Sequence, residues 1–444
     1  MPVDQVRDRA VSALLRVLEN DSHIDVTVDR TLRRGKLSPR GGRFLTHLVY
    51  GVVRHKLLCD HVLSAICDQP LDKIPAPVLM VLRMGVFQAF FCNNVTKPAL
   101  VHTGVDLARR RGNIGLAKMT NAVLRRIPDT LDAVQLPDRE KDFVNYLRVR
   151  YSMPRWMVRL WLELYGNEDA ERFCAACNEP APTVIRVNTL RTDIETLSQR
   201  LLTAGFATKP VRDCDDALLV SNEGDLLKSK LFRDGYFMFQ DPASMLAARL
   251  ITPQPGEHIL DMCAAPGGKT THIAALTGGK ARLIALERHC WRIARIHENC
   301  ARMGIPNVTT VCGDGLAPPF ADAMFDRVLL DAPCSGLGTL RRHPEIKWRT
   351  TPETPGQMAA AQVALLRKAV QLCKNGGLIV YSVCTLTRQE TLDVISEATS
   401  DGHCVLEDAP EQFNTWKTAQ GQYQTNPLAA AWDGFFLTRF RKRS

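Results

Sequence analysis

The chain has 444 residues, of which 45% are hydrophobic and 23% are charged. These values are ordinary for a folded globular protein and exclude a chain that is disordered throughout. No apolar run approaches the ~20 residues that a membrane-spanning helix requires, so no such helix is expected. The first residues, Met1–Gln5, lack the features of a secretory signal peptide, so a cytoplasmic protein of two or three domains is expected.

The positive charge is concentrated in the first third of the chain. The formal net charge is +10. Residues 1–150 hold 24 Lys and Arg against 15 Asp and Glu, whereas the remainder holds 33 against 32. Such an excess is typical of a surface that binds a polyanion such as RNA, although a merely solvated basic surface would look the same. Arg109–Arg111 and Arg125–Arg126 are candidate phosphate contacts.

The fourteen cysteines are expected to be thiols, because a reducing cytosol disfavours disulfides. Cys174 and Cys177 have the spacing of a zinc or redox pair. No second pair follows them, so we interpret them as neighbours on a helix and expect no metal site.

In chain order, the pattern changes from helical to mixed. Apolar residues recur at helical spacing in five early segments, at 5–20, 41–66, 75–92, 97–111 and 115–126. A connector at Pro128–Pro137 and a helical stretch with Trp156 and Trp161, which we interpret as core residues, come next. A strand at 183–188, a helix at 194–204 and short strands up to about residue 239 then predict a small βα subdomain.

The last part of the chain alternates strands and helices, as parallel α/β sheets do. A strand at 258–262 runs into a small-residue loop that opens a helix. Three further strands each end in an acid, at Glu287, Asp314 and Asp331. The carboxyl ends of parallel strands form the ligand-binding edge of such a sheet, and an acid in the place of Glu287 usually accepts from ribose hydroxyls.

The small-residue loop is also compatible with a P-loop. Gly268-Lys269-Thr270 fits the P-loop pattern, but Cys263 stands where its first glycine is required. Val328–Asp331 could pass for the strand whose acid holds magnesium in P-loop ATPases. Glu287 has no use in such a protein, and a nucleoside with a carboxylate and an amine, such as S-adenosylmethionine, suits the acids better.

Two cysteines lie at neighbouring strand ends. Cys334 follows the strand of Asp331, and Cys384 ends a later strand at 378–383. Adjacent parallel strands would place both sulfurs near Asp331. Thr387 and Glu390 have the spacing of a capping box for a following helix, whose dipole would favour a Cys384 thiolate.

These motifs resemble those of the RNA cytosine-C5 methyltransferases, the RsmB/Sun and Nop2/NSUN superfamily. The resemblance covers roughly residues 235–440 and depends on the loop at 263–269, on Asp331-Ala332-Pro333-Cys334-Ser335 and on Ser382-Val383-Cys384-Thr385. Segments 44–54 and 120–126 resemble a NusB-like domain. The resemblance implies an all-α N-terminal bundle (1–135), linker helices with a small α+β RRM-like subdomain (136–235), and a Rossmann-like methyltransferase domain (236–444).

The resemblance also implies roles for particular residues. Cys384 would attack C6 of the cytosine, Cys334 would assist release, and Asp331 would recognise the base and border the cofactor. The cofactor S-adenosylmethionine would lie on Glu287 (ribose), Asp314 (adenine) and the loop Cys263, Ala264, Ala265, Pro266, Gly267, Gly268 and Lys269 (methionine part). DNA C5 methyltransferases use a Pro-Cys nucleophile instead, and on that plan Cys334 would attack.

The sequence thus predicts a monomeric S-adenosylmethionine-dependent RNA (cytosine-5-)-methyltransferase that acts on 16S ribosomal RNA without a metal or a membrane. Three alternatives stay open: a transfer RNA methyltransferase, a P-loop ATPase and a non-catalytic RNA-binding assembly factor. Arg186, Asn188 and the stretch Arg341–Glu345 are further candidates for contact with RNA.

Overall fold

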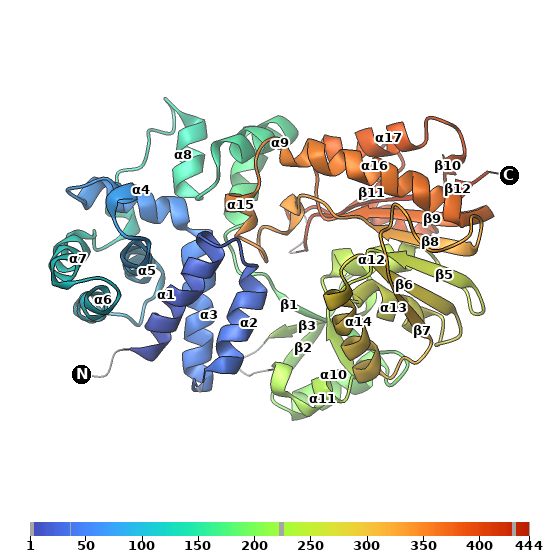
Figure 1. The fold of residues 1–444 in the computed structure, drawn as a ribbon, viewed down its shortest axis with the longest axis horizontal. Helices are drawn as coiled ribbons and strands as arrows, with labels where there is room; N and C mark the ends of the chain where they lie inside the picture. Colours follow the sequence, from blue (N-terminus) through green and yellow to red (C-terminus); the bar gives the residue numbers. More distant parts are fainter. Residues whose placement is uncertain (1–3, 36, 222–225, 429–431, 444) are drawn as a thin grey trace. The chain divides into compact units, whose positions relative to one another are not determined.

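The computed structural model describes residues 4–35, 37–221, 226–428 and 432–443 (Figure 1). The chain divides into two compact units, one of residues 1–180 and 340–352 and one of residues 181–339 and 353–444. The finer boundaries expected near residues 135 and 235 stay predictions. Among the described residues, none of the helices combines the length and the apolar character that crossing a bilayer requires.

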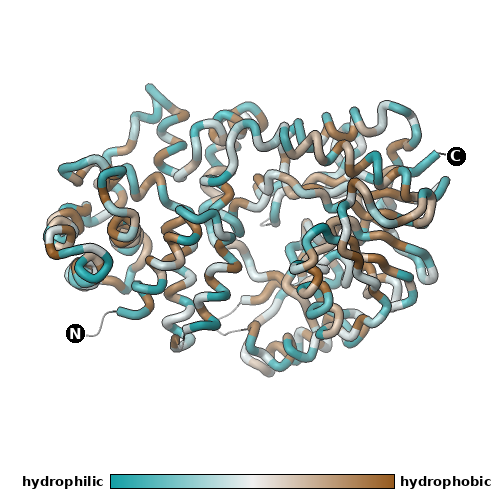
Figure 2. The backbone as a smooth tube through the Cα atoms, in the orientation of Figure 1, coloured by the Kyte–Doolittle hydropathy of each residue, from teal (hydrophilic) through white to brown (hydrophobic). Residues whose placement is uncertain are grey.

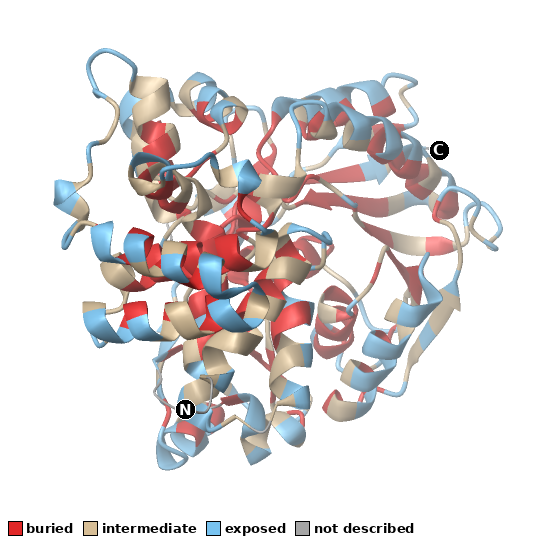
Figure 3. Ribbon diagram, turned by 60° about the vertical axis from the view of Figure 1, so that its left-hand side comes forward, coloured by how far each residue is buried: buried red, intermediate tan, exposed pale blue. Residues whose placement is uncertain are grey.

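The first unit is built from helices that pack their apolar sides together. Its main elements are α1 (Gln5–Leu18), α2 (Ile24–Arg34), α3 (Pro39–Arg54), α4 (Lys56–Ile66), α5 (Ala76–Phe91), α6 (Lys97–Arg111), α7 (Ile114–Arg126), α8 (Phe143–Arg150) and α9 (Arg155–Ala176). Hydrophobic and hydrophilic residues alternate along these helices (Figure 2), and buried and exposed sides alternate with them (Figure 3). The amphipathic pattern that predicted a helical bundle is therefore confirmed.

The helix α5 forms the centre of this unit, because its sequence is apolar on nearly every side. A Cβ atom on Gly51 of α3 would lie 1.9 Å from the Phe87 ring, so the two helices approach as closely as a glycine permits. Trp161 is fully buried, as expected, and Trp156 is half-buried.

Residues 340–352, with the short helix α15 (Ile346–Arg349), belong to the first unit. The buried ammonium group of Lys347 donates to the carbonyls of Arg54 and Ser152 at 3.2 and 3.3 Å and to Asn178 Oδ1 at 2.8 Å. Its burial lowers the pKa of Lys347 to about 7. The expectation that Arg341–Glu345 contacts RNA is wrong for Arg341 and Glu345, because both side chains are buried inside this unit.

The second unit begins with a small antiparallel sheet in the order β2-β3-β1-β4. Its strands are β1 (Thr183–Val187), β2 (Ala207–Val211), β3 (Cys214–Ser221) and β4 (Phe237–Phe239), with α10 (Ile194–Thr203) and α11 (Lys230–Arg233) between them. The expected RNA contacts of Arg186 and Asn188 are wrong, because both side chains are 0% exposed. Arg186 instead donates to the carbonyl of Gly268 at 2.6 Å and to Thr271 Oγ1 at 2.9 Å.

The larger sheet has the strand order β10-β12-β9-β8-β5-β6-β7, with β11 beside β12. Its bounds are β5 (His258–Met262), β6 (Arg282–Glu287), β7 (Val308–Cys312), β8 (Phe325–Asp331), β9 (Cys373–Val383), β10 (Cys404–Leu406), β11 (Tyr423–Gln424) and β12 (Phe436–Lys442). The strands β5 to β9 are mutually parallel, and β12 is antiparallel to β9. The glycine pair Gly376-Gly377 lies within β9, and the preceding helix ends at Leu372.

Helices cover both faces of this sheet (Figure 1). Successive residues of a strand point to opposite faces, so Ile259 and Leu329 pack with α12 (Pro242–Leu250), α13 (Gly268–Leu276) and α14 (Cys290–Met303). Their neighbours Leu260 and Leu330 pack with α16 (Thr354–Leu372) and α17 (Leu392–Ala398). This arrangement confirms the Rossmann-like α/β fold expected from the sequence.

Candidate active site

The strand registers bring all the predicted site residues to one edge of the larger sheet. Met262 pairs with Leu286 on one side and with Leu330 on the other, so the residues that follow β5, β6 and β8 lie side by side. Asp331 pairs with Ser382, two residues before Cys384. The edge is the carboxyl end of the parallel strands, where ligands bind in open α/β sheets.

The loop from Cys263 to Lys269 connects β5 to α13. Cys263 has φ 62°, and Gly267, which precedes α13, has φ 93°. A Cβ atom on Gly267 would lie 3.3 Å from the Cα atom of Ile296, so this position requires glycine for conformation and for space. Ala264 is buried and donates its N–H to the carbonyl of Leu286, whereas Ala265 is half-buried and Pro266 is exposed.

The acids predicted to hold the nucleoside lie at the ends of β6 and β7. Glu287 is buried and accepts hydrogen bonds from the N–H groups of Ala265 at 3.3 Å and His289 at 3.0 Å. Asp314 accepts from the N–H of Leu316 at 3.0 Å and keeps 40% of its side chain exposed. The hydrogen bond from Ala265 to Glu287 therefore places a carboxylate beside the backbone of the loop Cys263–Lys269, which would meet the ligand.

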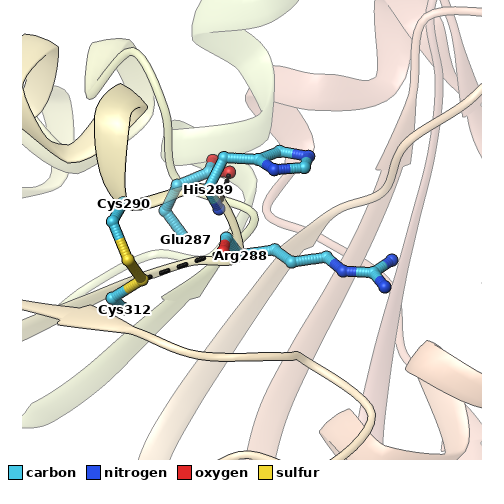
Figure 4. The surroundings of a disulfide bond; sticks show 5 residues. All are labelled: Glu287, Arg288, His289, Cys290 and Cys312. Carbon is cyan, nitrogen blue, oxygen red and sulfur yellow. Dashed lines mark hydrogen bonds between the residues drawn. A yellow bond between two sulfur atoms is a disulfide. The ribbon is translucent and has the colours of Figure 1, made fainter.

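A disulfide joins the same two strand ends, which corrects the expectation that every cysteine is a thiol (Figure 4). Cys290, at the start of α14, is bonded to Cys312, at the end of β7. The Cys312 sulfur lies 3.8 Å from the carbonyl oxygen of Arg288. Glu287 directly precedes Arg288, so the disulfide lies close to this acid in the chain. Both cysteines are exposed, so small thiols can reach the bond.

Asp331 lies where the loop Cys263–Lys269 meets the strands that lead to the two cysteines. Its Oδ2 atom accepts from the Lys269 ammonium group at 2.7 Å, and its Oδ1 atom accepts from Ser382 Oγ at 2.7 Å. Burial alone would lower the pKa of Lys269, but the Asp331 carboxylate outweighs burial and the pKa is raised. Lys269 therefore presents a fixed positive charge at this edge.

The two predicted catalytic sulfurs are in contact. Cys334 Sγ lies 3.2 Å from Cys384 Sγ, and both cysteines are half-buried. The hydrogen bond with Cys334 and burial raise the pKa of Cys384 well above its ordinary value, while the positive charge of Lys269 lowers it. A helix dipole does not offset this rise, because α17 begins only at Leu392.

The predicted capping box at Thr387 and Glu390 is not formed. These residues lie at a short 3₁₀ turn, Arg388–Glu390, where Thr387 makes no side-chain capping hydrogen bond. The Glu390 carboxylate is fully buried and accepts from the hydroxyl of Thr387 at 3.0 Å instead. The acid of the predicted capping box therefore binds a neighbouring side chain and does not cap a helix.

Two further polar residues at this edge were missed from the sequence. Asp261 is buried in β5, accepts from Thr270 Oγ1, and has its pKa raised by burial to about 7. Ser382 orients Asp331, as described above. Asp261 lies in the strand that precedes the loop 263–269, and Ser382 begins the motif Ser382-Val383-Cys384-Thr385, so a polar residue in an otherwise apolar strand was the available signal.

In the part of the chain that the structure describes, no group of three or more His, Cys, Asp or Glu is arranged to hold a metal ion. Cys174 and Cys177 are both buried in the first unit.

Comparison with known families gives three matches along the chain. Residues 4–129 match the NusB family, and residues 153–226 match the ferredoxin-like domain of RsmF/B-like methyltransferases. Residues 248–441 match the family described as 16S rRNA methyltransferase RsmB/F.

Similar whole proteins and solved structures agree with these matches. A probable ribosomal RNA small subunit methyltransferase B from Synechocystis is 35% identical over 98% of this chain and 99% of its own length. The crystal structure of PH0851 covers 100% of both chains with a TM-score of 0.85 at 25% identity. A methyltransferase homologue from Pyrococcus horikoshii covers 67% of this chain and 97% of its own, with a TM-score of 0.58 at 28% identity.

Proposed function

The chain belongs to the RsmB/F family of 16S rRNA methyltransferases, and on this basis we propose that it methylates C5 of a cytosine in 16S ribosomal RNA. The methyl group comes from S-adenosylmethionine, and the reaction passes through a covalent bond between Cys384 and C6 of the base. The observation that carries the proposal is the 3.2 Å contact between two sulfurs beside Asp331 and Lys269. Family membership also argues against the P-loop ATPase.

The residues at the sheet edge fit S-adenosylmethionine by their chemistry. The carboxylates of Glu287 and Asp314 suit the ribose hydroxyls and the adenine amine, which are hydrogen-bond donors. The loop Cys263–Lys269 leads into the N-terminus of α13, where backbone N–H groups favour the carboxylate of the methionine part. When bound, this molecule supplies a methyl group on a positively charged sulfur.

Cytosine C5 is a weak nucleophile until a thiolate adds at C6. In the proposed mechanism the Cys384 thiol loses its proton to solvent, and the thiolate forms the C6–S bond. The electron pair of the C5=C6 double bond then shifts through the ring, and negative charge develops at N3. Asp331 accepts from the exocyclic amine of the base. The Lys269 ammonium group, 2.7 Å from Asp331 Oδ2, is the adjacent proton source for N3. C5 then forms a bond to the methyl group as the bond from that methyl group to the positively charged sulfur breaks, so that the sulfur would leave as a neutral thioether.

Release requires a base. The C5 proton must leave and the C6–S bond must break, so that the double bond re-forms and Cys384 departs as a thiolate. Cys334 lies in contact with Cys384 and is the group that we assign to take the C5 proton. Without that base the product would stay attached to the protein.

The experiment is to incubate purified full-length variants with 16S rRNA and S-adenosylmethionine, with transfer RNA as the comparison substrate. We expect Cys334→Ala to accumulate an RNA–protein adduct that survives denaturing electrophoresis, and Cys384→Ser to form neither adduct nor 5-methylcytosine. Bisulfite sequencing identifies the modified nucleotide. Methylation by Cys384→Ser at the wild-type rate would overturn the mechanism, and the opposite pattern of adducts would assign the attack to Cys334.

A further inference from the structure

We propose that Glu390 is a positioning residue that holds the two cysteine-bearing loops together and thereby sets the distance between Cys334 and Cys384. The inference rests on the proposed function, because it explains how the two sulfurs are kept in contact. Glu390 does not touch the sulfurs. It acts through the residues that follow each of them, Ser335 and Thr385.

The Glu390 carboxylate is 0% exposed and is shared between the two loops. Its Oε1 atom accepts from the N–H of Ser335 at 2.8 Å, and its Oε2 atom accepts from the Ser335 hydroxyl. The same Oε2 atom accepts from Thr385 Oγ1 at 3.2 Å. One side chain thus binds the residue after Cys334 and the residue after Cys384.

Two more donors complete the environment of this carboxylate. Gln362 of α16 donates from Nε2 to Oε1 at 3.1 Å and also donates to the carbonyl of Pro333. Thr387 donates to Oε2 at 3.0 Å. All the groups that contact the carboxylate in these bonds are neutral, so the buried charge is stabilised by hydrogen bonds rather than by a cation.

The backbone alone ties the loops less closely to the sulfurs. Backbone hydrogen bonds join Ala332 to Ser382 and Gly338 to Cys384, on either side of Cys334. Between these two bonds lie residues 333–337, and in this stretch the bonds to Glu390 fix the backbone at Ser335. A displacement of a reacting group by about 1 Å can lower the reaction rate by about 100-fold. The hydrogen bonds that hold Ser335 should therefore affect the rate of methylation.

If Glu390 only stabilised the fold, losing any other buried hydrogen bond around Glu390 would lower the reaction rate as much as losing the bonds of its carboxylate. The Tyr381 hydroxyl donates to the backbone carbonyl of Glu390 at 2.8 Å and to Gln362 Oε1 at 3.0 Å. Tyr381→Phe therefore removes buried hydrogen bonds from the same cluster without changing the carboxylate contacts to either loop. It is the matched control.

The first readout measures the distance between the sulfurs and needs neither RNA nor cofactor. The oxidant diamide is reduced to a hydrazine while two thiols in contact form one disulfide. Peptide mass spectrometry then gives the yield of the Cys334–Cys384 bond separately from that of Cys290–Cys312. We expect the rate of bond formation to fall at least about 10-fold in Glu390→Ala and in Glu390→Asp, whose shorter carboxylate cannot reach both loops, and to change less than about 2-fold in Tyr381→Phe.

The second readout is single-turnover methylation with saturating RNA and S-adenosylmethionine. The expected rate is about 100-fold lower in Glu390→Ala, whereas cofactor affinity measured by calorimetry stays within about 2-fold. Glu390→Gln, which retains one acceptor oxygen for Ser335 and Gln362, should recover most of both readouts. If Glu390→Ala does not fold, Glu390→Asp and Glu390→Gln supply the comparison.

Two results would overturn the proposal. One is wild-type oxidation and methylation rates in folded Glu390→Asp or Glu390→Ala. The other is an equal loss in Tyr381→Phe, which would show a general effect of destabilisation. If the wild-type protein methylates no RNA, the proposed function fails, yet the oxidation rates still decide whether Glu390 positions the sulfurs.

Discussion

Lys269 joins the loop proposed to bind the cofactor to the proposed reacting groups through its contact with Asp331. Its positive charge lowers the pKa of Cys384, opposing the hydrogen bond with Cys334 and the burial that raise this pKa. The balance leaves the free enzyme with a protonated Cys384 at neutral pH. The attacking thiolate is therefore a minor species whose amount depends on pH and on Lys269.

This balance predicts the pH dependence of methylation. Because thiolate forms as pH rises, kcat/KM should increase with pH without a plateau below about pH 8.5, the pKa of an unperturbed cysteine. Lys269→Met removes a cation, raises the pKa of Cys384 further, and should move the profile to higher pH by about one unit. The measurement is kcat/KM for rRNA methylation between pH 6 and the alkaline limit of stability.

The control for that profile is Lys374→Met, which breaks a similar ion pair with Asp326 (2.6 Å) in the same unit. Lys374 is the second residue of β9, whereas Cys384 directly follows the end of that strand, so the charge is remote from the sulfurs. A Lys269→Met profile that levels off at the same alkaline pH as the wild-type profile, with only a lower limiting rate, would show that Lys269 positions groups without affecting the Cys384 thiol.

Among the elements, α14 and β7 are linked covalently by Cys290–Cys312 beside the two acids predicted to hold the nucleoside. The bond closes a segment with a sequence separation of 22 residues, and a closure of this size contributes about 3 kcal/mol to the free energy of unfolding. Reduction should therefore lower the melting temperature and weaken S-adenosylmethionine binding, since Glu287 and Asp314 lie within three residues of the bonded cysteines.

Calorimetric melting and cofactor titration with and without a reductant check this prediction. The variant Cys290→Ala/Cys312→Ala should melt like the reduced protein and should not respond to the reductant. Cys67→Ser, which alters a half-buried thiol of the first unit, should keep the wild-type response. Equal melting temperatures for oxidised and reduced wild-type protein would show that the bond adds no stability.

Elements with a strong local pattern could be predicted from the sequence, and those fixed by distant contacts could not. The helix expected at 97–111 is observed as α6, with the same bounds. The strands expected to end at Glu287 and Asp331 are observed as β6 and β8, whereas β7 ends at Cys312, two residues before Asp314. The helix α2 was missed, because its β-branched residues favour a strand locally and it is stabilised by burying Ile24 and Val28 against its neighbours.

The site shows the same division. The motifs indicated the strand ends, the loop and the two cysteines, because those features are local in sequence. The Cys290–Cys312 bond depends on the pairing of Glu287 with Cys312 in neighbouring strands, a register that spacing alone does not give. The burial of Glu390 depends likewise on Ser335, which is 55 residues away.

At the scale of the whole molecule, charge and chemistry are separated along the chain. Nearly all of the net charge of +10 lies in residues 1–150, within the first unit, whereas the predicted catalytic residues lie in the second. We expect the first unit to supply a large part of the affinity for RNA through phosphate contacts, and the second unit to recognise the base.

Reversing charge on the first unit tests this division. Arg109 and Arg125 are exposed near the ends of α6 and α7, and Arg109→Glu/Arg125→Glu should weaken rRNA binding and reduce the slope of log K against log salt by about 2. The rate of methylation at saturating RNA should stay near that of the wild type, because neither arginine belongs to the unit that holds the predicted catalytic residues.

The matched control is Arg282→Glu, an exposed arginine at the start of β6, opposite the strand ends that carry the site. Filter binding at several salt concentrations gives both slopes. An equal loss of slope in the control would mean that the second unit carries as much of the electrostatic attraction, and the concentration of charge in the first 150 residues would then have no special role in binding.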